Sequence, residues 1–382
     1  MIHIDNKADC CGCGACTISC PQKCITMVND TEGFLYPVVD QEKCVNCKIC
    51  ERVCPISNRA YTSQRFSLPK GYIAYCKNAN VRLNSSSGGI FSVLADYIFS
   101  ENGYVFGAAF DENFNVHHIC ISSTKNIELL RGSKYVQSTT ESTFYEVKQL
   151  LDLNQKVLYS GTACQIAGLN SYLGKRYTNL ITIDILCHGV PSPLVWYRYI
   201  HEQEKKHNSI LKSIVFRSKR TGWKSYSVLY RFQDGKETSR KFRRDPYMQL
   251  FLSNICLRPS CHKCAFKNLQ RCSDITIGDA WGVERYHPDM DDDKGTSIIL
   301  LHTEIGENLF HIIEHNLVYH EADVEKILPP WSDARKSVVP HKDRKIFFQK
   351  INGGKKVLSL SRLVRPSVFT RVYYRIMREI KK

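Results

Sequence analysis

Ten of the 18 cysteines lie within the first 54 residues, and their spacing is typical of metal ligands. Two copies of the run C-x-x-C-x-x-C-x-x-x-C-P occur there. Their cysteines are Cys10, Cys13, Cys16 and Cys20 in the first copy, and Cys44, Cys47, Cys50 and Cys54 in the second. In such runs, three closely spaced thiolates hold one four-iron cluster, and the fourth reaches the other cluster. We therefore predict two [4Fe–4S] clusters.

The crossed ligation makes a specific assignment. It predicts that Cys54 completes the cluster of the first copy and that Cys20 completes the cluster of the second. Zinc ribbons and disulfides are the alternatives, and two complete copies, each followed by proline, argue against both. Cys11 and Cys24 lie outside the pattern, so we expect them to pack as small hydrophobic residues.

A second group of thiols follows later in the chain. Residues 156–159, 166–173 and 180–186 alternate as strand, helix and strand, a pattern that predicts two parallel strands. Cys164 and Cys187 come just after the carboxyl ends of these strands, where such folds bind ligands.

The C-x-x-C unit of Cys261 and Cys264 adds two further thiols, with Cys256 and Cys272 close by in sequence. Alone, this unit is compatible with zinc, a redox disulfide or iron–sulfur, and inert buried thiols are a further alternative.

Two segments could contact phosphate. Ser86, Ser87, Gly88 and Gly89 precede an apolar stripe at helical spacing, and a helix N-terminus offers free N–H groups to an anion. An ordinary capped helix explains the same residues. The second segment is the loop of Ser133, Lys134 and Tyr135, for which a solvated loop is the alternative.

The elements that must position these residues suggest a modular chain. We predict an α+β ferredoxin-like dicluster module followed by an α/β body with a mixed, partly parallel sheet. The expected parts are a dicluster domain at 1–57, a linker at 58–70, a flavin-contacting region at 71–150, an α/β domain at 151–345 and a basic tail at 346–382.

The formal net charge is +16, and residues 355–382 contribute +8 of it. No nucleic-acid recognition motif accompanies this charge, so we expect no specific nucleic-acid partner. Residues 369–382 have the spacing of a basic amphipathic helix, which could contact an anionic membrane or pack on the protein itself. The start of the chain lacks a secretory signal, and no apolar run is long enough to span a bilayer. We expect a cytoplasmic protein, with peripheral membrane contact through the tail as one alternative.

Beyond these patterns, the body resembles the beta subunit of coenzyme F420-reducing hydrogenase and dehydrogenase, in its bacterial form with a fused ferredoxin. Six strings carry the resemblance in order over roughly residues 1–305: Ser86–Gly89, Gly132–Tyr135, Gly161–Gln165, Asp184–Pro193, Cys261-x-x-Cys264 and Asp274–Gly282. The family usually has proline where this chain has Ala163, and it tends to lack a cysteine at the position of Cys272.

The resemblance implies an iron–sulfur flavoprotein that moves electrons between clusters, FAD and a two-electron substrate. It implies flavin contact by the 86–89 turn and the 133–135 loop. Together with the loop positions, it also implies a third [4Fe–4S] cluster held by Cys187, Cys261, Cys264 and either Cys164 or Cys256. Similar bacterial proteins are associated with surface-polysaccharide synthesis. The expected partners are a redox protein or reduced carrier and a small-molecule substrate. An electron-carrier subunit without its own substrate is the alternative.

Overall fold

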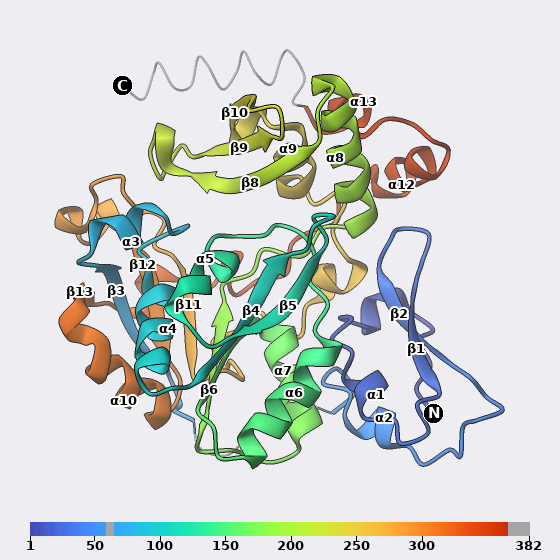
Figure 1. Ribbon diagram of the computed structural model, residues 1–382, viewed down its shortest axis with the longest axis horizontal. Helices are drawn as coiled ribbons and strands as arrows, with labels where there is room; N and C mark the ends of the chain where they lie inside the picture. The colour runs from blue at the N-terminus through green and yellow to red at the C-terminus, as the bar shows by residue number, and fades with distance from the viewer. Residues whose placement is uncertain (59–64, 366–382) are drawn as a thin grey trace.

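A mixed eight-stranded sheet forms the centre of the protein (Figure 1). The computed structural model describes residues 1–58 and 65–365. The strand order is β13-β3-β12-β11-β7-β6-β4-β5. The strands are β3 (Lys70–Cys76), β4 (Tyr104–Phe110), β5 (Val116–Ile121), β6 (Val157–Thr162), β7 (Leu180–Ile185), β11 (Ile275–Asp279), β12 (Ser297–Leu301) and β13 (Leu317–Glu321).

Four neighbouring strands, β4, β6, β7 and β11, run parallel. Leu158 faces one hydrophobic cluster and Tyr159 the other, so these strands are buried on both sides, as parallel strands usually are. Because the four strands point the same way, their carboxyl ends meet at one edge of the sheet. The sequence predicted this βαβ unit, and the register confirms it, with Tyr159 opposite Thr182.

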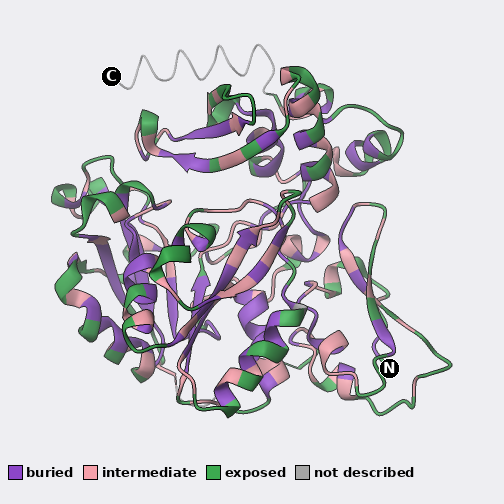
Figure 2. Cartoon of the chain, in the orientation of Figure 1, coloured by how far each residue is buried: buried purple, intermediate pink, exposed green. Residues whose placement is uncertain are grey.

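Helices cover both faces of the sheet (Figures 1 and 2). Two of them, α4 (Ile90–Ser100) and α10 (Glu304–Ile313), pack on the face that contains Leu158. The other face is covered by α6 (Glu141–Asp152) and α7 (Ala163–Leu173). The short helices of the body are α3 (Ala79–Leu83), α5 (Ile127–Leu130) and α11 (Val324–Ile327).

A smaller antiparallel sheet lies above the carboxyl edge of the main sheet in Figure 1. It contains β8 (Leu211–Ser218), β9 (Ser227–Phe232) and β10 (Glu237–Lys241). The helices beside it are α8 (Pro193–His207), α9 (Pro246–Leu252), α12 (Arg344–Asn352) and α13 (Val357–Leu360). An aromatic core that includes Trp196, Phe216 and Tyr247 joins these elements.

Residues 346–365, the described part of the predicted basic tail, pack on the body. Phe347, Phe348 and Ile351 are buried in the aromatic core, and α12 and α13 bury this part of the chain against α8 and α9. The amphipathic helix predicted at 369–382 lies outside the described residues.

The N-terminal module has the predicted ferredoxin-like form. Its strands β1 (Ile25–Asn29) and β2 (Leu35–Val39) form the expected antiparallel hairpin, and its helices are α1 (Ala15–Ile18) and α2 (Ile49–Arg52). The Asp30 carboxylate accepts two turn N–H groups, which fixes the hairpin turn.

The module and the body are joined by contacts between residues distant in sequence. Arg344 forms an ion pair with Glu32 at the tip of the hairpin. Phe66, in the described part of the predicted linker, donates its N–H to the His302 carbonyl. The main sheet includes strands from both sides of residue 150, so the regions predicted at 71–150 and 151–345 share one sheet. None of the helices in residues 1–58 and 65–365 has the length and apolarity that a membrane crossing requires.

Candidate functional site

The eight thiols of the N-terminal module fall into two groups. Burial, together with the neighbouring thiols of Cys10 and Cys54, raises the pKa of Cys16 to about 12. The Cys20 sulfur lies 3.4 Å from that of Cys24, which in turn neighbours Cys44. Cys20 also lines one hollow with the thiols of the second run: Cys44, Cys47 and Cys50. The structure thus places Cys54 with the first run and Cys20 with the second, as crossed ligation requires.

The body supplies a buried cation to the first thiol group. Arg258 is fully buried, and it donates to the carbonyls of Cys10 and Leu35 at 2.8 and 2.9 Å. Its guanidinium also lies 3.6 Å from the Cys10 sulfur. Burial raises the pKa of the Cys10 thiol, while Arg258 acts in the opposite direction. This arginine therefore favours the thiolate form, which is the form that ligates iron.

The first run also packs directly on α7. The Cys13 carbonyl accepts a hydrogen bond from Thr140, and a Cβ atom at Gly168 would lie 2.9 Å from the Cys13 sulfur. Gly168 thus lets the cluster-binding loop approach the helix closely.

We expect Gly168→Leu to lower the iron content of the full-length protein, because a side chain there must displace the Cys13 loop. Ser171→Ala on the same helix is the matched control and should leave the iron content unchanged. Iron and acid-labile sulfide analysis after anaerobic purification measures both. Full iron content in Gly168→Leu would show that the loop can move without losing its cluster.

The second thiol group is assembled by two loops of the body. Cys187 follows the carboxyl end of β7, and Cys164 lies in the first turn of α7, directly after β6. Cys261 lies in a 3-10 turn, and its sulfur accepts the Val190 N–H at 3.4 Å. Arg258 N–H donates to the Val190 carbonyl, which ties the two loops together.

The four thiols influence one another electrostatically. Burial raises the pKa of Cys187, and Cys261, Cys164 and Cys264 raise it further. The same combination of burial with Cys164 and Cys264 as neighbours raises the pKa of Cys261 to about 12. Four predicted ligands, distant in sequence, therefore lie close together at the carboxyl edge of the sheet.

Two other cysteines lie apart from this group. Burial raises the pKa of Cys256, Arg344 acts in the opposite direction, and the side chain packs in the aromatic core. The Cys272 thiol donates to the Ala163 carbonyl at 3.3 Å. The sequence left two candidates for the fourth ligand, and the geometry favours Cys164 over Cys256.

Cys11 connects the two thiol groups, a role that the sequence did not reveal. It is buried, and its pKa is raised by Cys13 and by burial but lowered by Cys164. Cys11 therefore neighbours both Cys13 of the first run and Cys164 of the body thiol group. Spacing alone could not show this, because Cys164 lies far along the chain.

The two segments predicted to contact flavin also meet. Ser133 donates from its backbone N–H and its hydroxyl to the Ser86 hydroxyl, at 2.8 and 2.9 Å. Arg217 on β8 donates to the Ser86 carbonyl and lies 3.3 Å from the Tyr135 hydroxyl. An ion pair to Asp279, at the end of β11, holds this arginine.

Within these segments, several groups already have partners. The Gly88 N–H donates to the Ser297 hydroxyl, and a Cβ at Gly88 would lie 2.5 Å from the Ala74 carbonyl. Close packing on β3 therefore explains this glycine. The Lys134 ammonium donates to two carbonyls of its own loop, those of Leu129 and Arg131. Gly89, with φ +90°, precedes α4 and has no side chain to cap the helix.

Sequence reasoning missed the cations and aromatic rings beside these loops. Lys219 donates to the carbonyls of Arg82 and Ser87, and burial, aided by Arg82 and Arg217, lowers its pKa to about 7. Trp281 stacks on Trp223 with ring centroids 4.4 Å apart. No spacing signal marks Arg217, on β8, or Lys219, in the turn directly after it, because their partners lie far away in the sequence.

Comparison with known families agrees with this arrangement. The 4Fe-4S dicluster domain matches residues 9–58. The C-terminal domain of the beta subunit of coenzyme F420 hydrogenase/dehydrogenase matches residues 154–327, which include all four thiols of the body group. Residues 154–327 thus carry the C-terminal domain of the F420 hydrogenase/dehydrogenase beta-subunit family. The chain is an iron–sulfur electron-transfer protein related to that subunit and carries a fused dicluster domain.

Among solved structures, this protein is similar to a chain of the xenon-derivatised F420-reducing [NiFe] hydrogenase complex from Methanosarcina barkeri. The two share 15% sequence identity with a TM-score of 0.46, over 76% of this chain and 92% of that chain. No curated protein matches the chain.

Proposed function

We propose that this protein is an iron–sulfur flavoprotein oxidoreductase that passes electrons between three [4Fe–4S] clusters, FAD and a two-electron substrate. One observation carries the proposal. The thiol group of Cys164, Cys187, Cys261 and Cys264 neighbours the dicluster module through Cys11, and ring contacts from His188 through Phe251 reach Tyr135 in the 133–135 loop. On the family resemblance alone, we place the substrate in surface-polysaccharide synthesis.

The residues of the body thiol group fit a cluster better than a single ion. Thiolates around tetrahedral zinc lie about 3.8 Å apart, as Zn–S bonds of about 2.3 Å require. Among the described residues, no three of these sulfur atoms lie within 4.8 Å of one another. The N–H donated to the Cys261 sulfur supports a four-iron cluster, whose potential depends on such hydrogen bonds.

The loops also fit an anionic, ring-bearing cofactor. Arg217 and Lys219 place two basic side chains next to the Ser86 and Ser87 carbonyls, beside the N-terminus of α4. When bound, flavin supplies the conversion between one-electron and two-electron chemistry. The role of this chain's residues is to hold the cofactor at the edge of the sheet where the thiol group also lies.

A series of ring contacts links these two places. The ring of His188, which follows Cys187, lies 5.2 Å from that of Phe251, and Phe251 stacks on Tyr135 at 4.9 Å. These contacts fill the space between the thiol loop and the 133–135 loop with packed side chains. Tyr247 fixes the same loop by donating its hydroxyl to the Tyr135 carbonyl.

Flavin content tests the proposal. The full-length protein, purified without oxygen, is expected to release one flavin per chain on denaturation. Lys219→Met should lower that occupancy, because it removes the donor that fixes the Arg82 and Ser87 carbonyls and a positive charge beside the loop. Lys212→Met, at an exposed position on β8, the strand that directly precedes Lys219, is the matched control.

Iron content should be unchanged in both variants, which shows that folding is intact. Absence of flavin from the wild-type protein, with its iron complete, would instead favour the electron-carrier alternative, in which a partner enzyme handles the substrate. Equal flavin in Lys219→Met and wild type would place the cofactor away from this lysine.

A further inference from the structure

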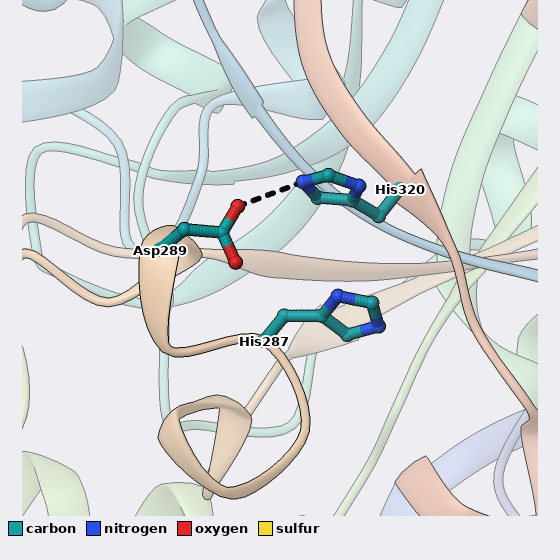
Figure 3. A group of neighbouring side chains, drawn as sticks. All are labelled: His287, Asp289 and His320. Carbon is teal, nitrogen blue, oxygen red and sulfur yellow. Dashed lines mark hydrogen bonds and ion pairs between the residues drawn. The ribbon is translucent and has the colours of Figure 1, made fainter.

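Three side chains outside the redox site converge at the opposite margin of the main sheet. His287 and Asp289 lie on the loop that follows β11, and His320 lies on the edge strand β13 (Figure 3). One potential ligand atom from each lies within 4.8 Å of the other two. The Asp289 carboxylate accepts from His320 Nε2 at 2.8 Å, and the two imidazoles stack with centroids 5.0 Å apart.

We propose that His287, Asp289 and His320 bind a borderline divalent transition-metal ion such as Zn²⁺. Two imidazoles and one carboxylate form a ligand set that suits zinc and iron(II), and three protein ligands leave further coordination positions to water. Within residues 1–58 and 65–365, no side chain hydrogen bonds to the His287 ring, so its nitrogens are available. The site is partly open, with Asp289 61% and His320 44% exposed, so an ion can enter without unfolding the chain.

The backbone that presents His287 and Asp289 is well anchored. The His287 N–H donates to the Val283 carbonyl, and the Thr296 hydroxyl donates to the Met290 carbonyl. Met290 is buried against the sheet. The two loop ligands are therefore held in place beside β13 before any ion arrives, which lowers the entropic cost of binding.

A metal here would tie the loop to the sheet edge. The same loop carries Trp281, which stacks on Trp223, and Asp292, which pairs with Arg82. Arg82 in turn donates to the Gly295 carbonyl. The ion would thus fix one end of a segment whose other contacts lie beside the Ser86–Gly89 turn. Its role is structural and separate from electron transfer.

The test is a titration of the cluster-loaded, chelator-treated full chain with Zn²⁺ by calorimetry, without oxygen. The wild type is expected to bind one more equivalent of Zn²⁺ than His287→Ala and His320→Ala. Asp289→Asn should raise the Kd of this additional Zn²⁺ ion at least tenfold, because the amide keeps a hydrogen-bonding group but loses the charge. His201→Ala, an exposed histidine on α8, is the matched control and should bind like the wild type.

Zinc taken up by free cysteines is the same in every variant and cancels in the comparison. Absorbance of the clusters confirms that each variant is folded. Hydrogen exchange supplies the second readout: Zn²⁺ should slow exchange in residues 283–291 of the wild type and of His201→Ala only. Equal zinc stoichiometry in the wild type and both histidine variants would overturn the proposal.

Discussion

Replacement of Cys54 by alanine is expected to remove about four iron atoms from the cluster of Cys10, Cys13 and Cys16. The structure gives the reason, because Cys54 is an electrostatic neighbour of both Cys10 and Cys16. Loss of the fourth thiolate exposes one iron of that cluster. Iron and sulfide analysis of the full-length protein, with electron paramagnetic resonance of the reduced clusters, measures the loss.

Double variants identify which cluster is lost. Cys13→Ala with Cys54→Ala should lose no more iron than either change alone, since both affect one cluster. Cys47→Ala with Cys54→Ala should lose about eight iron atoms, because each change affects a different cluster. Cys24→Ala, which removes a thiol outside the repeat, is the control. The reverse pattern of additivity would show that each run holds its own cluster without crossing.

The second large effect concerns the thiol group of the body. Cys164→Ala and Cys261→Ala should each remove about four iron atoms and leave the two N-terminal clusters in place. Cys256→Ala should keep the full iron content, because its thiol lies in the aromatic core. Cys272→Ala should behave in the same way, since its thiol bonds to the Ala163 carbonyl.

The same variants separate the third cluster from inert thiols. If the wild type contains only about eight iron atoms and Cys164→Ala loses none, the body thiols are structural. If Cys256→Ala loses iron and Cys164→Ala does not, the fourth ligand is Cys256. Flavin content, measured in parallel, shows whether a missing cluster also disturbs the cofactor loops.

Much of the architecture was predictable because its signals are local. The dicluster module follows from two cysteine runs, and the family match over residues 9–58 confirms it. The βαβ unit follows from hydrophobic periodicity and from the Gly161–Gln165 turn, and the register of β6 and β7 confirms it. In each of these elements, the residues that determine the structure are close in sequence.

Long-range contacts account for what the sequence could not show. Arg258 contacts Cys10 across 248 positions, and no pattern links a lone arginine to a distant thiol. The same limit hid the contact between Cys11 and Cys164. Residues 346–365 were predicted as part of a basic tail because the chain there is basic and loses the strand–helix alternation, whereas buried side chains that include Phe347 and Phe348 hold them to α8 and α9.

The order of strands in the main sheet has a consequence for biosynthesis. Strand β3, near residue 70, lies between β12 and β13, which are more than 200 residues further along the chain. The backbone N–H and C=O groups of β3 therefore lack their sheet partners until most of the protein has been synthesised. Strand pairings between such distant segments form slowly. The dicluster module, made first, has a hairpin and cysteine runs that are complete by residue 54. Iron delivery to the module can thus precede closure of the sheet, whereas the thiols of the body meet only after residue 264 has been made.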